Sequence, residues 1–217
     1  DDAAILKGLE ELSKNTEKLP HPISRAMAIK YVLENERIYI NEHDYFVGLY
    51  SLSRLANRTT FDKWAKDSQS LRDTDTLERS RDFNNSGAVM IWTDYDHVVP
   101  DWKSLMELGF SGIRERAREY KRKHKENGTL NSEMTAFFEG IEIQYTAIIE
   151  LIDRMYYTAL KQEFEKATKI TECLKNLRNG APSSFYEALQ LIYIYFIISE
   201  SIDSYQVRSL GNGLDNT

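Results

Sequence analysis

The chain has 217 residues, of which 41% are hydrophobic and 29% are charged, with a formal net charge of −6 at pH 7. These proportions are typical of globular proteins, so long disordered segments are not expected. The acidic balance argues against non-specific binding of nucleic acid. A single cysteine excludes an intrachain disulfide and fits a reducing compartment, and no signal peptide is recognisable at the start. We therefore expect one cytoplasmic folded unit over residues 1–217, with a weak internal boundary near residues 84–100.

Strand signals are confined to short stretches of the first half. Arg37–Ile40 and Tyr45–Tyr50 alternate or carry aromatic and β-branched side chains, and Ala88–Trp92 is a short apolar run after the turn-like Asn84–Gly87. Thr60–Asp82 is a weak helix candidate, because many of its residues have low helix propensity. These patterns predict a small ribbon or edge strands.

The first strong helix signal is Asp101–Glu126, which begins after a proline and ends at Asn127 and Gly128. Its last part, RERAREYKRKHKE, is a run of charges. Cations near the C-terminal end of a helix interact favourably with the negative end of its dipole. We therefore interpret the run as a solvated helix face and not as a binding patch.

A second helical pattern extends from Ser132 to about Asn179, where apolar residues recur every three or four positions. The pattern is long for one globular helix, so we expect a bend or break between Glu163 and Thr171. Cys173 lies in this pattern, and we interpret it as a buried structural thiol. Gly180 then supplies a stop signal.

The last helical pattern contains the apolar run Leu189–Ile198, about half as long as the roughly 20 residues that a bilayer requires. Ser184 and Glu187 form an S-x-x-E capping box before it. We expect a helix buried on most sides and no membrane span. Its remaining apolar face predicts self-association of the chain, and hence a homo-oligomer.

The sequence contains no phosphate-binding loop and no spacing typical of metal ligands, since its four histidines are scattered: His21, His43, His97 and His124. The numerous aromatic residues fall mostly at helical spacing, which favours core packing over a stacking platform.

Three stretches carry family-like motifs: Arg25–Gly48, RAMAIKYVLENERIYINEHDYFVG; Asp96–Ile113, DHVVPDWKSLMELGFSGI; and Ser183–Thr217, SSFYEALQLIYIYFIISESIDSYQVRSLGNGLDNT. In this order they resemble the glycyl radical enzymes of the pyruvate formate-lyase-like family. The second stretch has Asp96 and Trp102 where the family has Gly and Tyr. The third has one residue more than the family's SLGxLD turn.

The resemblance implies a mainly α fold of long helices with a few short strands, corresponding to the N-terminal helical part of the family's α/β barrel. The thiyl cysteine loop and the radical glycine loop of the family are not found in this sequence, so no catalytic residue, metal or bound cofactor is expected in it. In the family, an activase with an iron–sulfur cluster uses S-adenosylmethionine to install the glycyl radical under anaerobic conditions. The implied partners are this activase and a small-molecule substrate.

The same resemblance nominates residues for substrate binding. His97 stands at the histidine of the family's GH-x-x-PDY stretch and is expected near the substrate, although it can instead cap the following helix or donate to a buried carbonyl. In the polar turn of the third stretch, Arg208 is expected to pair with a substrate carboxylate or, alternatively, with Asp203 or Asp215. Its neighbours in that turn are the further candidates Tyr205, Gln206 and Ser209.

Two hypotheses follow. The first is the N-terminal region of a glycyl radical lyase or dehydratase, which contributes one wall of the substrate cavity and is inactive alone. The sequence ends within its last motif, which we interpret as truncation. The second is a non-catalytic helical scaffold or protein-interaction module derived from that fold.

Overall fold

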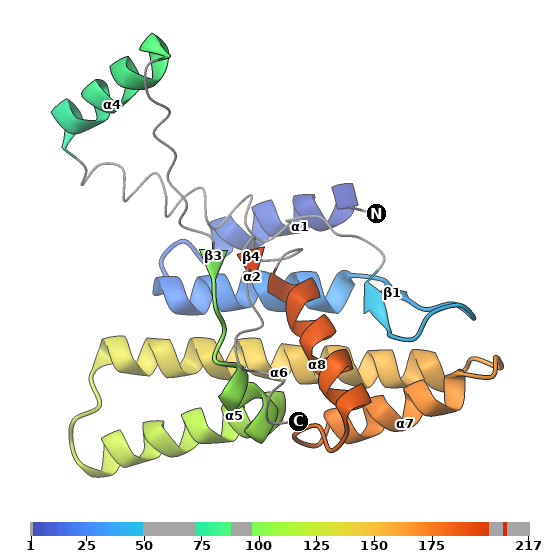
Figure 1. Ribbon diagram of the computed structural model, residues 1–217. Coiled ribbons are helices and arrows are strands. Elements are labelled where there is room, and N and C mark those ends of the chain that lie inside the picture. Colours follow the sequence, from blue (N-terminus) through green and yellow to red (C-terminus); the bar gives the residue numbers. More distant parts are fainter. Residues whose placement is uncertain (1, 50–72, 88–96, 200–205, 208–217) are drawn as a thin grey trace.

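The computed structural model describes residues 2–49, 73–87, 97–199 and 206–207 (Figure 1). This part of the chain is mainly helical, which confirms the predicted fold class. Its helices are α1 (Asp2–Asn15), α2 (His21–Asn35), α4 (Thr74–Ser86), α5 (Trp102–Glu126), α6 (Ser132–Leu160), α7 (Ala167–Leu177) and α8 (Phe185–Ile197). Its strands have two residues each and form two pairs. Strand β1 (Ile38–Tyr39) pairs antiparallel with β2 (Gly48–Leu49), and β3 (His97–Val98) pairs parallel with β4 (Gln206–Val207).

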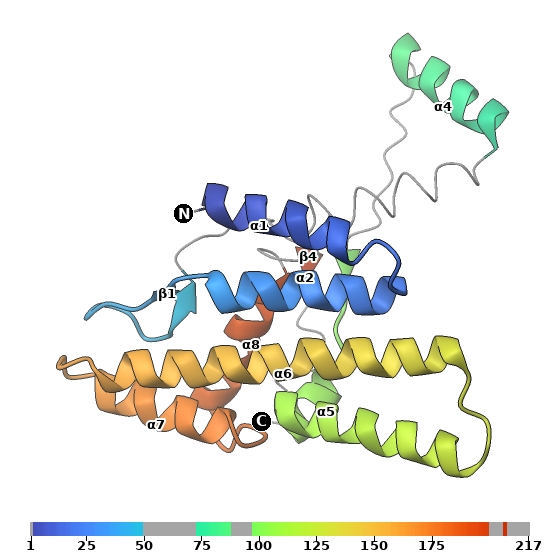
Figure 2. The same ribbon diagram turned by 180° about the vertical axis from the view of Figure 1, so that it is seen from behind.

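Helix α6 is the centre of the helical body. It packs against α2 on one side and against α5 and α7 on the other (Figure 1, Figure 2). Its buried side includes Leu151, Ile152 and Met155, each at most 1% exposed. At Gly140 the two helices α2 and α6 approach so closely that a Cβ atom would lie 2.7 Å from the carbonyl oxygen of Pro22. Most of the hydrophobic core therefore surrounds one long helix.

The two long helical patterns of the sequence are confirmed with one addition. The break that was predicted around Glu163–Thr171 separates α6 from α7, but it lies at residues 161–166, and residues 167–171 already belong to α7. Asp101 caps α5, because its side chain accepts from the backbone nitrogen of Ser104 at 3.1 Å. Inside α5, however, Gly109 has φ 63° and ψ −178°, so the chain bends there. The helical pattern did not predict this kink.

The small ribbon predicted at Arg37–Ile40 and Tyr45–Tyr50 is confirmed by β1 and β2. It is attached to α8 by the buried Gln190, whose Oε1 accepts from the backbone nitrogen of Val47 at 2.9 Å and whose Nε2 donates to the Val47 carbonyl at 3.2 Å. The pairing satisfies a polar side chain in an otherwise apolar helix, as buried amides require.

Helix α4 lies partly within the weak candidate Thr60–Asp82. Its low-propensity start is a cap: Asp73 accepts from the backbone nitrogen of Asp75 at 3.2 Å. The expected turn at Asn84–Gly87 is wrong in its first three residues, which form the last turn of α4 before Gly87 ends it at φ 68°. The predicted strand Ala88–Trp92 lies outside the described residues.

Helix α8 begins at the predicted cap, where Ser184 accepts from the backbone nitrogen of Glu187 at 3.3 Å. The Glu187 carboxylate accepts from the backbone nitrogen and hydroxyl of Ser183, at 2.6 and 2.8 Å. The helix is buried on one side, but Phe185 and Tyr193 are 57% and 41% exposed. In the described part of the chain, every helix is too short or too polar to cross a bilayer.

Candidate functional site

The structure brings the two segments that carry the predicted substrate-binding residues into direct contact. In the parallel pair of β3 and β4, His97 is in register with Gln206 and Val98 with Val207. The pairing joins two backbones that are distant along the chain (Figure 1). Tyr205, Arg208 and Ser209 lie outside the described residues, as do Asp203 and Asp215. The substrate-binding roles of the five candidates stay predictions: His97, Tyr205, Gln206, Arg208 and Ser209.

Aromatic packing joins the start of α5 to the end of α8. Trp102 is 3% exposed, and its ring meets the Tyr195 ring edge-on with centroids 5.2 Å apart. The Phe196 ring lies 6.1 Å from the same tryptophan. Trp102 follows β3 by four residues, and α8 is the last described helix before β4. This packing therefore joins the start of α5, which follows β3, to the last described helix before β4.

A polar network anchors the first turns of α5. The Ser104 hydroxyl donates to Asp101 Oδ2 at 2.6 Å, and Arg116 Nη1 donates to Ser104 Oγ at 2.9 Å. Hydrogen bonds from Ser104 hold the pKa of Asp101 below its usual value. The N-terminal cap of α5 is thus supplied by Asp101. An Asp-x-x-Ser pattern is visible in the sequence, whereas the contact with Arg116 required the folded chain.

Close backbone packing holds the kink of α5 against the loop that precedes α8. A Cβ atom at Gly109 would lie 2.3 Å from the carbonyl oxygen of Gly180 and 3.0 Å from the backbone nitrogen of Ala181. No side chain fits between these backbones. Gly109 is thus a positioning residue that the helical pattern of the sequence missed.

The thiol of Cys173 is buried in α7, as predicted, at 3% exposure. Burial, together with the charge of Glu187, raises its pKa to about 12. Its neighbours in the core are apolar side chains such as Ile170 and Leu174. A thiyl radical must reach a substrate, so this enclosed thiol does not fit the radical chemistry of glycyl radical enzymes. The described residues also contain no cluster of three or more His, Cys, Asp or Glu side chains that could hold a metal ion.

Comparison with known proteins agrees with this architecture. The family model described as "Pyruvate formate lyase-like" matches residues 57–213. The match includes Asp96–Ile113 and most of Ser183–Thr217, whereas Arg25–Gly48 lies outside it. No curated protein matches the chain in sequence.

Three solved structures are similar in fold. A glycyl radical enzyme from Archaeoglobus fulgidus is 21% identical, with a TM-score of 0.63 over 91% of this chain and 31% of its own. The glycerol-bound B12-independent glycerol dehydratase from Clostridium butyricum is 22% identical, with a TM-score of 0.60 over 91% and 32%. A structure concerning 1,2-propanediol dehydration in Roseburia inulinivorans is 20% identical, with a TM-score of 0.65 over 90% and 31%. The chain thus spans about a third of the length of these proteins.

Proposed function

Because the chain belongs to the pyruvate formate lyase-like family, we propose that it forms the N-terminal helical region of a glycyl radical enzyme and contributes one wall of the substrate cavity. The observation that supports this proposal is the register of His97 with Gln206 in β3 and β4. Two segments nominated separately for substrate binding lie side by side. One wall of a cavity requires this kind of convergence.

The proposed residues have complementary chemistry. An imidazole with an ordinary pKa of about 6.5 can hydrogen-bond a hydroxyl or carboxylate, or move a proton near neutral pH, and we assign this role to His97. A guanidinium can bind a carboxylate through two parallel hydrogen bonds, which is the role assigned to Arg208. Tyr205, Gln206 and Ser209 supply further polar groups at the same turn. Together they suit a small, oxygen-rich organic substrate.

We propose that the chain is inactive alone. Its cysteine is buried and does not fit the thiyl role, so the hydrogen-abstracting thiyl cysteine and the radical glycine belong to a further part of the enzyme. The radical would be installed there by an activase with an iron–sulfur cluster that uses S-adenosylmethionine. The contribution of the present residues is to bind and orient the substrate.

The reaction is proposed to be a radical dehydration or lyase reaction of anaerobic metabolism, carried out in the cytoplasm. Formate acetyltransferase chemistry and decarboxylation are further outcomes in the family. Two of the similar structures concern a glycerol dehydratase and 1,2-propanediol dehydration. Vicinal diols are therefore the first substrates to assay, followed by pyruvate and small carboxylic acids.

The test uses the product of the native reading frame, purified anaerobically with its activase. We expect a glycyl radical signal in electron paramagnetic resonance, and turnover of at least one of these substrates. His97→Ala and Arg208→Lys should lower kcat/KM by about tenfold or more while the radical signal persists, because each removes a substrate hydrogen bond. The exposed residues His43 and Arg79 provide matched controls, His43→Ala and Arg79→Lys.

Two results would overturn the proposal in different ways. Unchanged kcat/KM in the His97 and Arg208 variants would remove these residues from the cavity wall. A native product that acquires no glycyl radical would instead support the second hypothesis, a helical scaffold or interaction module.

A further inference from the structure

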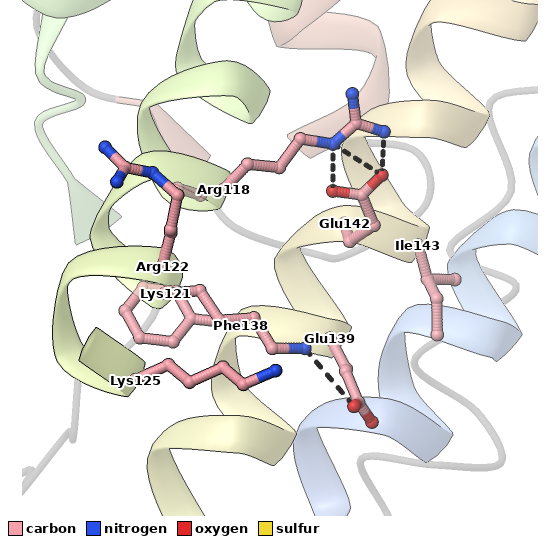
Figure 3. Close-up of a pocket in the computed structure, with 9 residues that line it drawn as sticks. Arg118, Lys121, Arg122, Lys125, Phe138, Glu139, Glu142 and Ile143 are labelled. Atoms are coloured by element: carbon pink, nitrogen blue, oxygen red, sulfur yellow. Dashed lines mark hydrogen bonds and ion pairs between the residues drawn. The ribbon is translucent and has the colours of Figure 1, made fainter. Parts of the chain in front are cut away.

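A groove of about 580 Å³ lies between the C-terminal half of α5 and the N-terminal half of α6 (Figure 3). It is separate from the β3–β4 pair, because all of its α5 residues follow the kink at Gly109. Its volume falls within the range of small-molecule sites, about 300–1,000 Å³. Neither the proposed function nor the family motifs account for it.

One wall of the groove is cationic. Arg118, Lys121, Arg122 and Lys125 recur at spacings that place them on one face of α5. The interpretation of this charge run as only a solvated face is therefore incomplete, since these four cations line a concave surface. The opposite wall has two carboxylates, so the groove has a net formal charge of +2 on a chain whose net charge is −6.

Ion pairs engage three of the four cations, because Arg122 Nη1 also donates to Glu126 Oε1, outside the groove lining, at 2.7 Å. Arg118 Nε donates to Glu142 Oε2 at 2.7 Å, and Lys121 Nζ lies 3.3 Å from Glu139 Oε1 (Figure 3). Lys125 has no ion pair within the described part of the chain. Pairs of this exposure contribute little to stability and exchange readily with an incoming anion.

The lining between the charges is apolar. Phe138 and Ile143 of α6 are half-buried and line the groove. The Phe138 ring is supported by neighbouring rings, edge-on by Phe137 at 5.7 Å and by His124 at 6.1 Å. A supported ring of this kind offers a fixed apolar surface, which a ligand can cover without reordering the helix.

We propose that the groove binds a small organic anion in which the acid group is attached to a hydrocarbon chain or ring. The acid group would pair with Lys121 and Lys125, and the hydrocarbon would cover Phe138 and Ile143. A simple anion would gain only a screened attraction at an exposed site. A neutral hydrocarbon would leave Lys125 without an anionic partner. The site therefore selects for both properties in one molecule.

The test measures binding of octanoate to the full chain by amide NMR, with acetate and 1-octanol as probes of each property alone. We expect octanoate to cause saturable chemical-shift changes at the amides of Phe138, Glu139 and Ile143. The dissociation constants of the other two probes should be about tenfold larger. The double variant Lys121→Gln/Lys125→Gln should raise the octanoate dissociation constant at least about fivefold. The matched control, Lys103→Gln/Lys175→Gln, changes two exposed lysines elsewhere and should leave it unchanged.

The proposal is overturned if octanoate gives no saturable shift at these amides, or if both double variants bind it equally well. Equal binding of 1-octanol would also overturn it, because the acid group would then contribute nothing. Thermal unfolding of both variants within about 2 °C of the parent would show that a loss of binding is not a loss of fold, since surface substitutions change stability little.

Discussion

Replacing Gly109 by alanine should destabilise the fold by about 2–6 kcal/mol. The backbone at this position, φ 63° and ψ −178°, belongs to a region reserved for glycine, where another residue costs about 1–3 kcal/mol. The new Cβ would also lie 2.3 Å from the Gly180 carbonyl oxygen, a backbone atom that cannot rotate away. Overpacking of this kind costs a further 1–3 kcal/mol or so. The total is a large share of a typical stability of about 5–15 kcal/mol.

Two other glycines separate these contributions. Gly128 has φ 68° but nothing within 4 Å of an added Cβ, so Gly128→Ala should cost only about 1–2 kcal/mol. Gly140 is helical, and its Cβ would meet the Pro22 carbonyl oxygen at 2.7 Å, so Gly140→Ala isolates the steric contact. Urea unfolding followed by circular dichroism measures all three. If Gly109→Ala is no more destabilising than Gly128→Ala, the close packing of α5 on the loop before α8 is not the constraint we describe.

Three further predictions concern buried or half-buried polar groups. For Glu187, burial opposes ionisation, but hydrogen bonds from α7 and from the start of α8 outweigh burial and lower the pKa of the carboxyl group. The ionised carboxylate therefore stabilises the folded chain above the unfolded pKa of about 4.3, and this stabilisation is lost as pH falls through the folded pKa. Glu187→Gln should thus lower the free energy of unfolding, measured by urea unfolding, by about 1–3 kcal/mol at pH 7 and by progressively less below about pH 4. A loss that does not change with pH would contradict this prediction. The pKa of Cys173 is raised to about 12 by burial, so alkylation at pH 8 should follow global unfolding, as mass spectrometry in increasing urea will test; rapid labelling of the folded chain would be inconsistent with burial. Arg154 donates to two backbone carbonyls at the end of α2, so Arg154→Met should lower the thermal midpoint by roughly 2–10 °C, and an unchanged midpoint would mean that these bonds contribute nothing.

Local signals were sufficient to predict both ends of α5 and the start of α8, whereas α1 and α2 were not predicted from them. The caps at Asp101 and Ser184 depend on hydrogen bonds to residues within the same turn, and such bonds follow from sequence spacing alone. The same reasoning failed at Asn84–Ser86, because small polar residues favour turns intrinsically but are tolerated in the last turn of a helix that ends at Gly87. The local preference of a residue therefore predicts where a helix ends only when no neighbouring residue has a stronger preference.

The kink at Gly109 was beyond the reach of such signals. A glycine within a periodic apolar pattern is usually tolerated as a helical residue. At this glycine, the place of a Cβ atom is taken by the backbone of Gly180, about 70 residues later in the chain. The register of His97 with Gln206 likewise could not be predicted from the sequence. The family resemblance nominated both segments but could not show that their backbones pair. Contacts between distant segments depend on the packing of the helices that connect them.

The candidate site is consequently governed by α5 more than by its own strands. A parallel pair of two residues has few hydrogen bonds and is not stable in isolation. On the β3 side, the chain that follows the strand is held by the packing of Trp102 on α8 and by the contact of Gly109 with Gly180. A change at Gly109 should therefore alter the position of β3 relative to β4 as well as the free energy of unfolding. If His97 and Gln206 belong to the substrate cavity, this glycine tunes the cavity from outside it, without contacting the substrate.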